Sequence, residues 1–212
     1  ENHYHMTTTT AQAANVLSHL EYYLQIVWPE LNVNVVSTTE QWAGAAIAGP
    51  KSREMLSKLY PDLDVSNEAL PFMGYKEAEF FGVPSRIFRI SFSGELAYEI
   101  NVKSDHGMFM WEKMMEVGKE FGNQPYGTEA LSTLRIEMGH VAGPELDGRT
   151  IPSDVSLNGL VSKKKDFIGK NSLGREAFNV ESRQKIVGLI PIDRKSSIPE
   201  GSHIVQDQNA KL

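Results

Sequence analysis

The stretch Phe88–Ile100 constrains the fold of this chain more than any other, because it has the alternation of a β-hairpin. Apolar side chains recur at every second position on both arms: Phe88, Ile90 and Phe92 on the first, and Leu96, Tyr98, Ile100 and Val102 on the second. The polar, glycine-containing triplet 93–95 lies between the arms and supplies a turn. A sheet with at least one tight antiparallel pair is therefore expected.

The register of this hairpin decides how Glu99 is used. A three-residue loop pairs Phe92 with Leu96 and collects the apolar residues on one face, whereas a two-residue loop would set apolar residues opposite polar ones. We therefore expect the first register, which places Arg89 directly opposite Glu99. Spacing alone favours a cross-strand ion pair worth a few tenths of a kcal/mol over a carboxylate that binds a ligand.

Composition excludes several classes of function. The formal net charge of −6 argues against nucleic-acid binding, which needs a basic face. The absence of cysteine excludes disulfides and thiolate catalysis and fits a reducing compartment. No apolar run approaches the ~20 residues of a membrane span. His3 and His5 could share one strand face, but no further ligands lie near them, so no metal site is expected.

Helical and strand patterns are intermixed along the 212 residues without a regular β-α-β rhythm, which indicates an α+β protein. Helices are expected at residues 11–28, 51–59 and 108–118 and from Thr128 onward. Strands are expected at residues 32–37, 42–47, 74–81 and 84–92, and a separate strand-rich unit from Arg183. The length suits one large domain or two small ones.

Five segments, in order over nearly the whole chain, resemble the folate-binding aminomethyltransferase family. They are MTTTT (6–10), AIAGPKSR (46–53), PFMGYKEAE (71–79), PYGTEALSTLRIEMG (125–139) and KKKDFIGKNSL (163–173). The hairpin itself is similar to the family's S/T-G-E-x-x-Y-E-I segment. The family includes the glycine cleavage T protein and the C-terminal halves of sarcosine oxidase alpha subunits and dimethylglycine dehydrogenases. FRISFSGELAYEINV and PYGTE resemble the sarcosine oxidase branch most.

The resemblance implies a fold of ferredoxin-like units packed around a folate cavity, followed by a small C-terminal β-barrel. On this basis residues 1–182 are expected to form the folate-binding domain with its N-terminal part missing. Residues 183–212 are expected to be the start of the truncated barrel. The acid–base aspartate of the family would lie upstream of this fragment, so its catalytic residues are unknown, and the fragment is expected to be inactive alone.

The implied activity is capture of a one-carbon unit. In the sarcosine oxidase branch, a flavin on another subunit oxidises sarcosine, and tetrahydrofolate takes up the one-carbon unit as 5,10-methylenetetrahydrofolate. The implied partners are the other subunits of a cytoplasmic heterotetramer, including the flavin-bearing beta subunit. FAD or FMN and NAD would belong to the parent complex and not to this fragment.

The resemblance also marks folate-binding residues. Glu99 matches the family's glutamate that accepts two hydrogen bonds from the amidine-like edge of the pterin. Arg89 either tunes Glu99 or forms a separate structural pair. Tyr126 either stacks on the ligand or is a buried structural tyrosine. Thr128 stands where the T protein has a folate-contacting arginine, and it is also a plain helix-capping residue.

Two alternatives stay open. In the same class, the chain could be an aminomethyltransferase of the glycine cleavage system or the folate domain of a dimethylglycine dehydrogenase; Thr128 counts against the first. In a different class, it could be a non-catalytic assembly module of a multi-subunit enzyme. The two classes differ in whether replacing Glu99 weakens binding of reduced folate.

Overall fold

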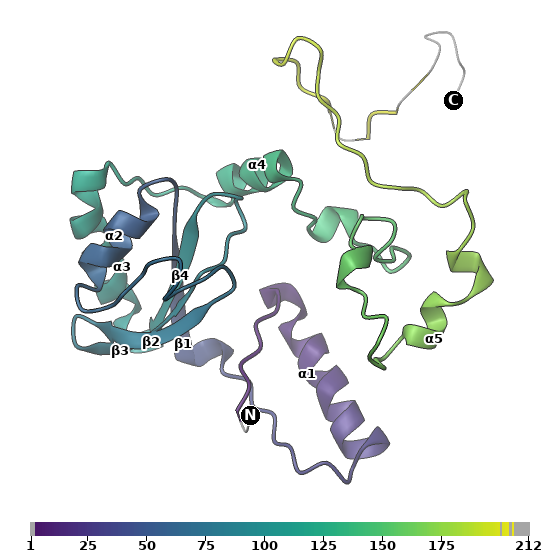
Figure 1. Cartoon of the computed structure of the whole chain (residues 1–212), viewed down its shortest axis with the longest axis horizontal. Helices are drawn as coiled ribbons and strands as arrows, with labels where there is room; N and C mark the ends of the chain where they lie inside the picture. Colours follow the sequence, from purple (N-terminus) through teal and green to yellow (C-terminus); the bar gives the residue numbers. More distant parts are fainter. Residues whose placement is uncertain (1–2, 200, 204, 206–212) are drawn as a thin grey trace. The chain divides into compact units, whose positions relative to one another are not determined.

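A computed structural model describes residues 3–199, 201–203 and 205. The chain divides into two compact units, Glu1–Gly127 and Thr128–Leu212 (Figure 1). Each unit is described by itself below.

The first unit is built on a four-stranded antiparallel sheet with the order β1-β4-β3-β2. Its strands are β1 (Trp42–Ala48), β2 (Tyr75–Phe80), β3 (Val83–Phe88) and β4 (Ala97–Lys103). A two-residue turn joins β2 to β3, and both of its residues, Phe81 and Gly82, have positive φ angles (48° and 83°). Such turns match the right-handed twist of the strands that they connect.

Two helices, α2 (Ser52–Leu59) and α3 (Gly107–Gly118), pack against the sheet and close the core (Figure 1). The alternation of β4 places Tyr98, Ile100 and Val102 in this core, where none has any exposed surface. Leu56 of α2 and Ile87 of β3 are also fully buried. The period-2 pattern of the second arm thus predicts its buried face correctly.

The predicted register of the hairpin is wrong by one residue. Phe88, and not Arg89, pairs with Glu99, and the connecting loop spans residues 89–96. The reason is that the backbone of Arg89 is bonded elsewhere: its N–H donates to the Gly74 carbonyl (2.9 Å), and its carbonyl accepts from the Met73 N–H (2.9 Å). Phe88 consequently lies on the same face as Glu99, opposite the core.

The loop is also held at its far end. The Leu96 carbonyl accepts hydrogen bonds from the Gly49 N–H (2.9 Å) and the Ser52 hydroxyl (2.7 Å), at the start of α2. Gly49 has φ +120°, a conformation that side-chain-bearing residues rarely adopt. The segments AIAGPKSR and FRISFSGELAYEI, which are far apart in sequence, therefore meet at one carbonyl oxygen.

The α+β class is confirmed, but the element order is β-α-β-β-β-α and differs from the β-α-β-β-α-β order of a ferredoxin-like unit. β4 follows β3 through a loop where that order has a helix. Residues 32–37 form no strand. The expected helix at 11–28 is present as α1 (Ala13–Tyr22), which continues into a π-helical turn (Tyr23–Val27).

The second unit contains α4 (Thr128–Met138) and α5 (Lys170–Leu173). Its residues 183–199, 201–203 and 205 contain no strand, and the rest of the expected barrel start lies outside the described residues. The domain boundary expected at residue 182 stays a prediction. Short 3₁₀ helices complete both units: Thr10–Gln12, Thr39–Gln41, Ser104–His106, Lys119–Phe121, Gly143–Glu145, Asn158–Leu160 and Glu176–Phe178.

Candidate functional site

The sheet face opposite α2 and α3, which we call the open face, carries Glu99. Pairing across the strands arranges its side chains in rows. The first row is Ala46, Glu99, Phe88 and Tyr75, and the second is Gly44, Asn101, Arg86 and Glu77. Glu99 thus stands near the middle of the sheet, between a small residue and an aromatic one.

Glu99 is half-buried and has no partner. Within the part of the chain that the structure describes, no side chain or backbone N–H donates to its carboxylate, and no cation pairs with it. Burial raises the pKa of this carboxyl above its usual value. The cross-strand ion pair expected with Arg89 is absent, because the register turns Arg89 away.

Arg89 instead holds a turn. Its Nη1 donates to the Leu70 carbonyl (2.9 Å), in addition to the two backbone bonds described above. These bonds fix Met73 at φ 62°, a left-handed conformation that is unusual for a side-chain-bearing residue. The described contacts of Arg89 are thus bonds to backbone groups and include no ion pair, and its predicted role in ligand binding stays a prediction.

The nearest row carries a different arginine, which the sequence analysis missed. Arg86 stacks over the Trp42 ring, with its guanidinium carbon 4.1 Å from the ring centroid, and its Nε lies 3.6 Å from Oε1 of Glu77. Its charge is directed to these two residues and leaves Glu99 unpaired. Trp42 pairs with Lys103 on β4, and Arg86 pairs with Asn101 on the same strand. The closeness of Arg86 to Trp42 can therefore be deduced only once the strand pairing is known.

The residues of β1 nearest to Glu99 on the open face have small side chains or none. Position 44 is a glycine, and a Cβ there would come within 2.8 Å of the Asn101 side-chain oxygen. Position 46, directly beside Glu99, carries only an exposed methyl group. A flat polar group can therefore approach the carboxylate across β1 without displacing a large side chain.

The two remaining predicted site residues lie outside the sheet. Tyr126 belongs to the first unit and precedes α4; 43% of its surface is exposed, so it is no buried structural tyrosine. Thr128 belongs to the second unit, is exposed and is the first residue of α4, so it stands one position inside the helix from the capping position expected for it. Their contacts with folate stay predictions.

Buried charges in the second unit are paired. Arg135 of α4 is buried and contacts Glu145 (Nη1–Oε2 2.8 Å). Asp154 accepts from Arg183 Nε (3.0 Å) and Nη2, and Arg183 holds the pKa of Asp154 well below its usual range. Saturated pairs of this kind indicate structural roles, and nothing in the spacing of these residues predicts them.

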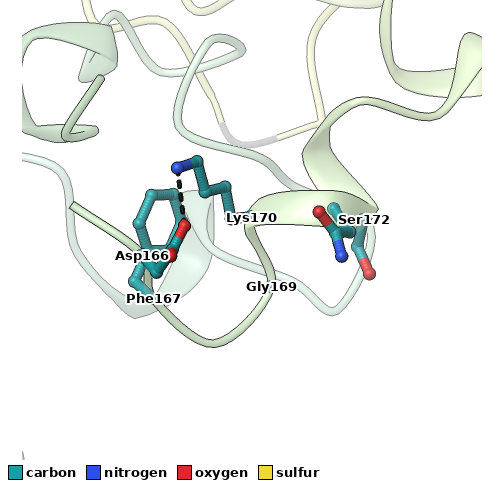
Figure 2. A pocket seen from close by; sticks show the side chains of 6 residues that line it. Asp166, Phe167, Gly169, Lys170 and Ser172 are labelled. Atoms are coloured by element: carbon teal, nitrogen blue, oxygen red, sulfur yellow. Dashed lines mark hydrogen bonds and ion pairs between the residues drawn. The ribbon is translucent and has the colours of Figure 1, made fainter. Parts of the chain in front are cut away.

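A shallow hollow in the second unit has a volume of about 220 Å³ and is lined by Asp166, Phe167 and residues 169–172 (Figure 2). Two of the lining residues form an ion pair, with Lys170 Nζ 2.8 Å from Asp166 Oδ1. The hollow is smaller than typical ligand pockets, and its charges neutralise each other.

Among the described residues, no group of three or more His, Cys, Asp or Glu side chains could hold a metal. No helix in the described ranges has the length and apolar character to cross a membrane.

Comparison with known proteins gives the family. The model of the GCVT N-terminal domain matches residues 1–165. The sarcosine oxidase subunit alpha of Rhizobium meliloti (strain 1021) is 47% identical over 208 residues, which are 97% of this chain and 21% of that protein. That of Corynebacterium sp. (strain P-1) is 46% identical over 209 residues, 98% of this chain and 22% of that protein.

A more distant relative is the aminomethyltransferase of Thermoanaerobacter sp. (strain X514), with 34% identity over 183 residues, 85% of this chain and 48% of that protein. The chain belongs to the GCVT N-terminal domain family, whose members in this comparison are enzymes. It spans about a fifth of the length of the sarcosine oxidase alpha subunits that it matches.

Proposed function

We propose that this chain is the tetrahydrofolate-binding region of a sarcosine oxidase alpha subunit. In that role it holds reduced folate while the one-carbon unit of oxidised sarcosine is captured as 5,10-methylenetetrahydrofolate. The bound folate would supply the nucleophilic nitrogens, and this chain would supply binding and orientation. In the same proposal, the chain's parent subunit assembles with a flavin-bearing beta subunit into a heterotetramer. The flavin and NAD are bound elsewhere in that complex and not by this chain.

The observation that carries the proposal is the unpaired, half-buried carboxylate of Glu99. A carboxylate removed from water without a partner costs stability, so its retention calls for a ligand that completes it. The N–H and exocyclic amino group of a pterin lie side by side and match the two oxygens of one carboxylate. Ala46, which pairs with Glu99 on β1, carries only an exposed methyl group and leaves room for that flat ring.

Identity supports the sarcosine oxidase branch over the other members of the class. The match to sarcosine oxidase alpha subunits is 47% over almost the whole chain, against 34% over a shorter stretch for an aminomethyltransferase. Thr128, which replaces the T-protein arginine, agrees with this order.

We also propose that residues 183–212 begin a further domain, because their described apolar residues are largely exposed. The cytoplasmic location stays a prediction.

Calorimetric titration of tetrahydrofolate into the chain tests the proposal. We expect saturable binding at one site, and Glu99→Gln should weaken it by about 1–3 kcal/mol, the cost of one charge-assisted hydrogen bond. Glu79→Gln is the matched control, since Glu79 is an exposed carboxylate on the same face of the sheet, and it should leave affinity unchanged.

Two results would contradict the proposal. Absence of binding both to the chain and to the intact alpha subunit that contains it would remove tetrahydrofolate as its ligand and would leave family membership unaffected. Equal affinity of wild type and Glu99→Gln would mean that the carboxylate does not contact the ligand, and would favour the non-catalytic assembly module.

A further inference from the structure

Residues 183–186, which we call the anchored segment, are attached to the rest of the second unit through one residue, Asp154. Asp154 lies in a turn at residues 152–156 and is buried. Its Oδ1 accepts a hydrogen bond from Arg183 Nε (3.0 Å) and its Oδ2 accepts one from Arg183 Nη2, so both carboxylate oxygens are used. A two-pronged pair of this kind fixes the orientation of an arginine as well as its position.

Two more residues of the anchored segment bind Asp154. The Ile186 N–H donates to the backbone carbonyl of Asp154 (2.7 Å). Lys185 Nζ lies 3.4 Å from Asp154 Oδ1 and donates to the Ser153 carbonyl (3.3 Å). Because backbone and side-chain groups both take part, the segment is held along its length and not at a single atom.

The surroundings of Arg183 suit a guanidinium group. Its Nη2 also donates to the Arg149 carbonyl (2.9 Å), and its guanidinium carbon lies over the Phe178 ring, 5.4 Å from the centroid. The Ile151 N–H donates to Asp154 Oδ2 (3.1 Å) and holds the carboxylate in place. Only 19% of the Arg183 side chain and 11% of the Asp154 side chain are exposed, so water and salt screen this pair less than a surface pair.

The attachment stops at Ile186. From residue 187 onward, the hydrogen bonds among the described residues stay within that stretch, as in the turn where Asp193 accepts from the Lys195 and Ser196 N–H groups. The apolar side chains directly after the anchored segment, such as Val187 and Leu189, are more than half exposed. A chain that is held up to one residue and not beyond it has its hinge at that residue.

We propose that Asp154 anchors residues 183–186 to the second unit, and that the hinge toward the following part of the chain therefore lies after Ile186. The further domain proposed above then begins at residue 187 and not at residue 183. The anchored segment moves with the second unit as one body, whether or not the chain binds folate. One carboxylate controls this attachment, because its loss leaves the Arg183 guanidinium without a charged partner in a largely buried place.

Limited trypsin digestion of the 212-residue chain tests the inference, because trypsin cleaves after arginine and lysine side chains that are free to enter its own pocket. In the wild-type chain, cleavage after Arg183 and Lys185 should be at least tenfold slower than after the exposed Arg194. Asp154→Asn keeps the shape of the side chain and removes its charge. It should speed cleavage after Arg183 and Lys185 about tenfold or more and leave the rate after Arg194 unchanged.

Asp147→Asn is the matched control. Asp147 is a carboxylate that also pairs with an arginine near the same turn, since it accepts from Arg149 Nε (2.9 Å). Its described hydrogen bonds and ion pair are made with residues 149 and 150 and not with the anchored segment. The replacement should therefore leave all three cleavage rates unchanged.

Hydrogen exchange gives a second readout that does not depend on a protease. The Ile186 amide should exchange at least several-fold faster in Asp154→Asn than in the wild-type chain, because its acceptor is the Asp154 carbonyl. The amides of α4 should keep their protection, which shows that the second unit remains folded.

The inference is overturned if trypsin cleaves after Arg183 as fast as after Arg194 in the wild-type chain, or if Asp154→Asn changes neither of the two slow rates. It is also overturned if Asp154→Asn removes the protection of α4 together with that of Ile186, since Asp154 would then hold the whole second unit and not its last segment. These rates are measured without folate, so a failure of the proposed function leaves them unaffected.

Discussion

For Glu99, the proposed binding role and the cost in stability can be measured separately. Burial raises the pKa of its carboxyl in the folded chain. A raised pKa means that the folded state favours the protonated form, so this stability is present below the usual pKa near 4.3 and is lost as pH rises through the folded pKa. At pH 7 the charged group therefore destabilises the free chain. Because Glu99 is only half-buried and solvent screens its charge, Glu99→Gln should increase the free energy of unfolding by only a few tenths of a kcal/mol at pH 7, and by nothing below about pH 4.

Urea unfolding of the ligand-free chain at both pH values measures this difference, with the exposed Glu79→Gln as the reference. A loss of stability in Glu99→Gln at pH 7 would reveal a favourable partner for the carboxylate and would contradict its unpaired state. The expected combination of higher stability and weaker folate binding is typical of a group kept for function.

The neighbouring residue, Tyr98, provides a second test at the residue scale. Its ring is fully buried, and its hydroxyl has no hydrogen-bond partner among the described residues. A buried unsatisfied hydroxyl costs free energy, so Tyr98→Phe should stabilise the chain by about 1 kcal/mol. Tyr60→Phe is the matched opposite, because the Tyr60 hydroxyl hydrogen-bonds to Ser85 (3.0 Å) in the same core, and it should destabilise by about 1–2 kcal/mol. Urea unfolding that gave both variants the same sign would contradict this account.

At the scale of elements, the sequence predicts periodicity well and register poorly. The alternation of Tyr98, Ile100 and Val102 correctly places one face of β4 in the core. β3 carries adjacent apolar residues, Ile87 and Phe88, which fit either face equally well. The choice is made by hydrogen bonds from residues distant in sequence. No local pattern contains that information.

The same distinction explains which parts of the site could be predicted. Glu99 was found through the resemblance of its hairpin to a family motif, and the structure places it on the open face without a partner. The Arg86–Trp42 stack and the close approach of Gly44 to Asn101 follow only from strand pairing. The tight turn at Gly49 is visible as a Gly-Pro pair, but its hydrogen bond to Leu96 is not.

At the scale of the whole molecule, residues 186–192 of the second unit form an apolar run, and most of its side chains are exposed in the part of the chain that the structure describes. The most exposed side chains of the run are Ile190 (80%) and Ile192 (104%), and Val187 and Leu189 are also more than half exposed. Its beginning is fixed, since the Ile186 N–H donates to the Asp154 carbonyl (2.7 Å). A contiguous exposed apolar segment on a fixed support favours association with another apolar surface.

We therefore expect the isolated chain to self-associate through this run as its concentration rises. Ile190→Lys combined with Ile192→Lys adds two like charges at the most exposed residues of the run and should raise the concentration needed for association about tenfold or more. Size-exclusion chromatography with light scattering over a concentration series measures the effect, and unfolding of the first unit should not change. Val36→Lys, at an equally exposed but separate residue of that unit, is the control. Association unaffected by the double variant but abolished by Val36→Lys would move the interface to the first unit and would contradict association through the apolar run at residues 186–192.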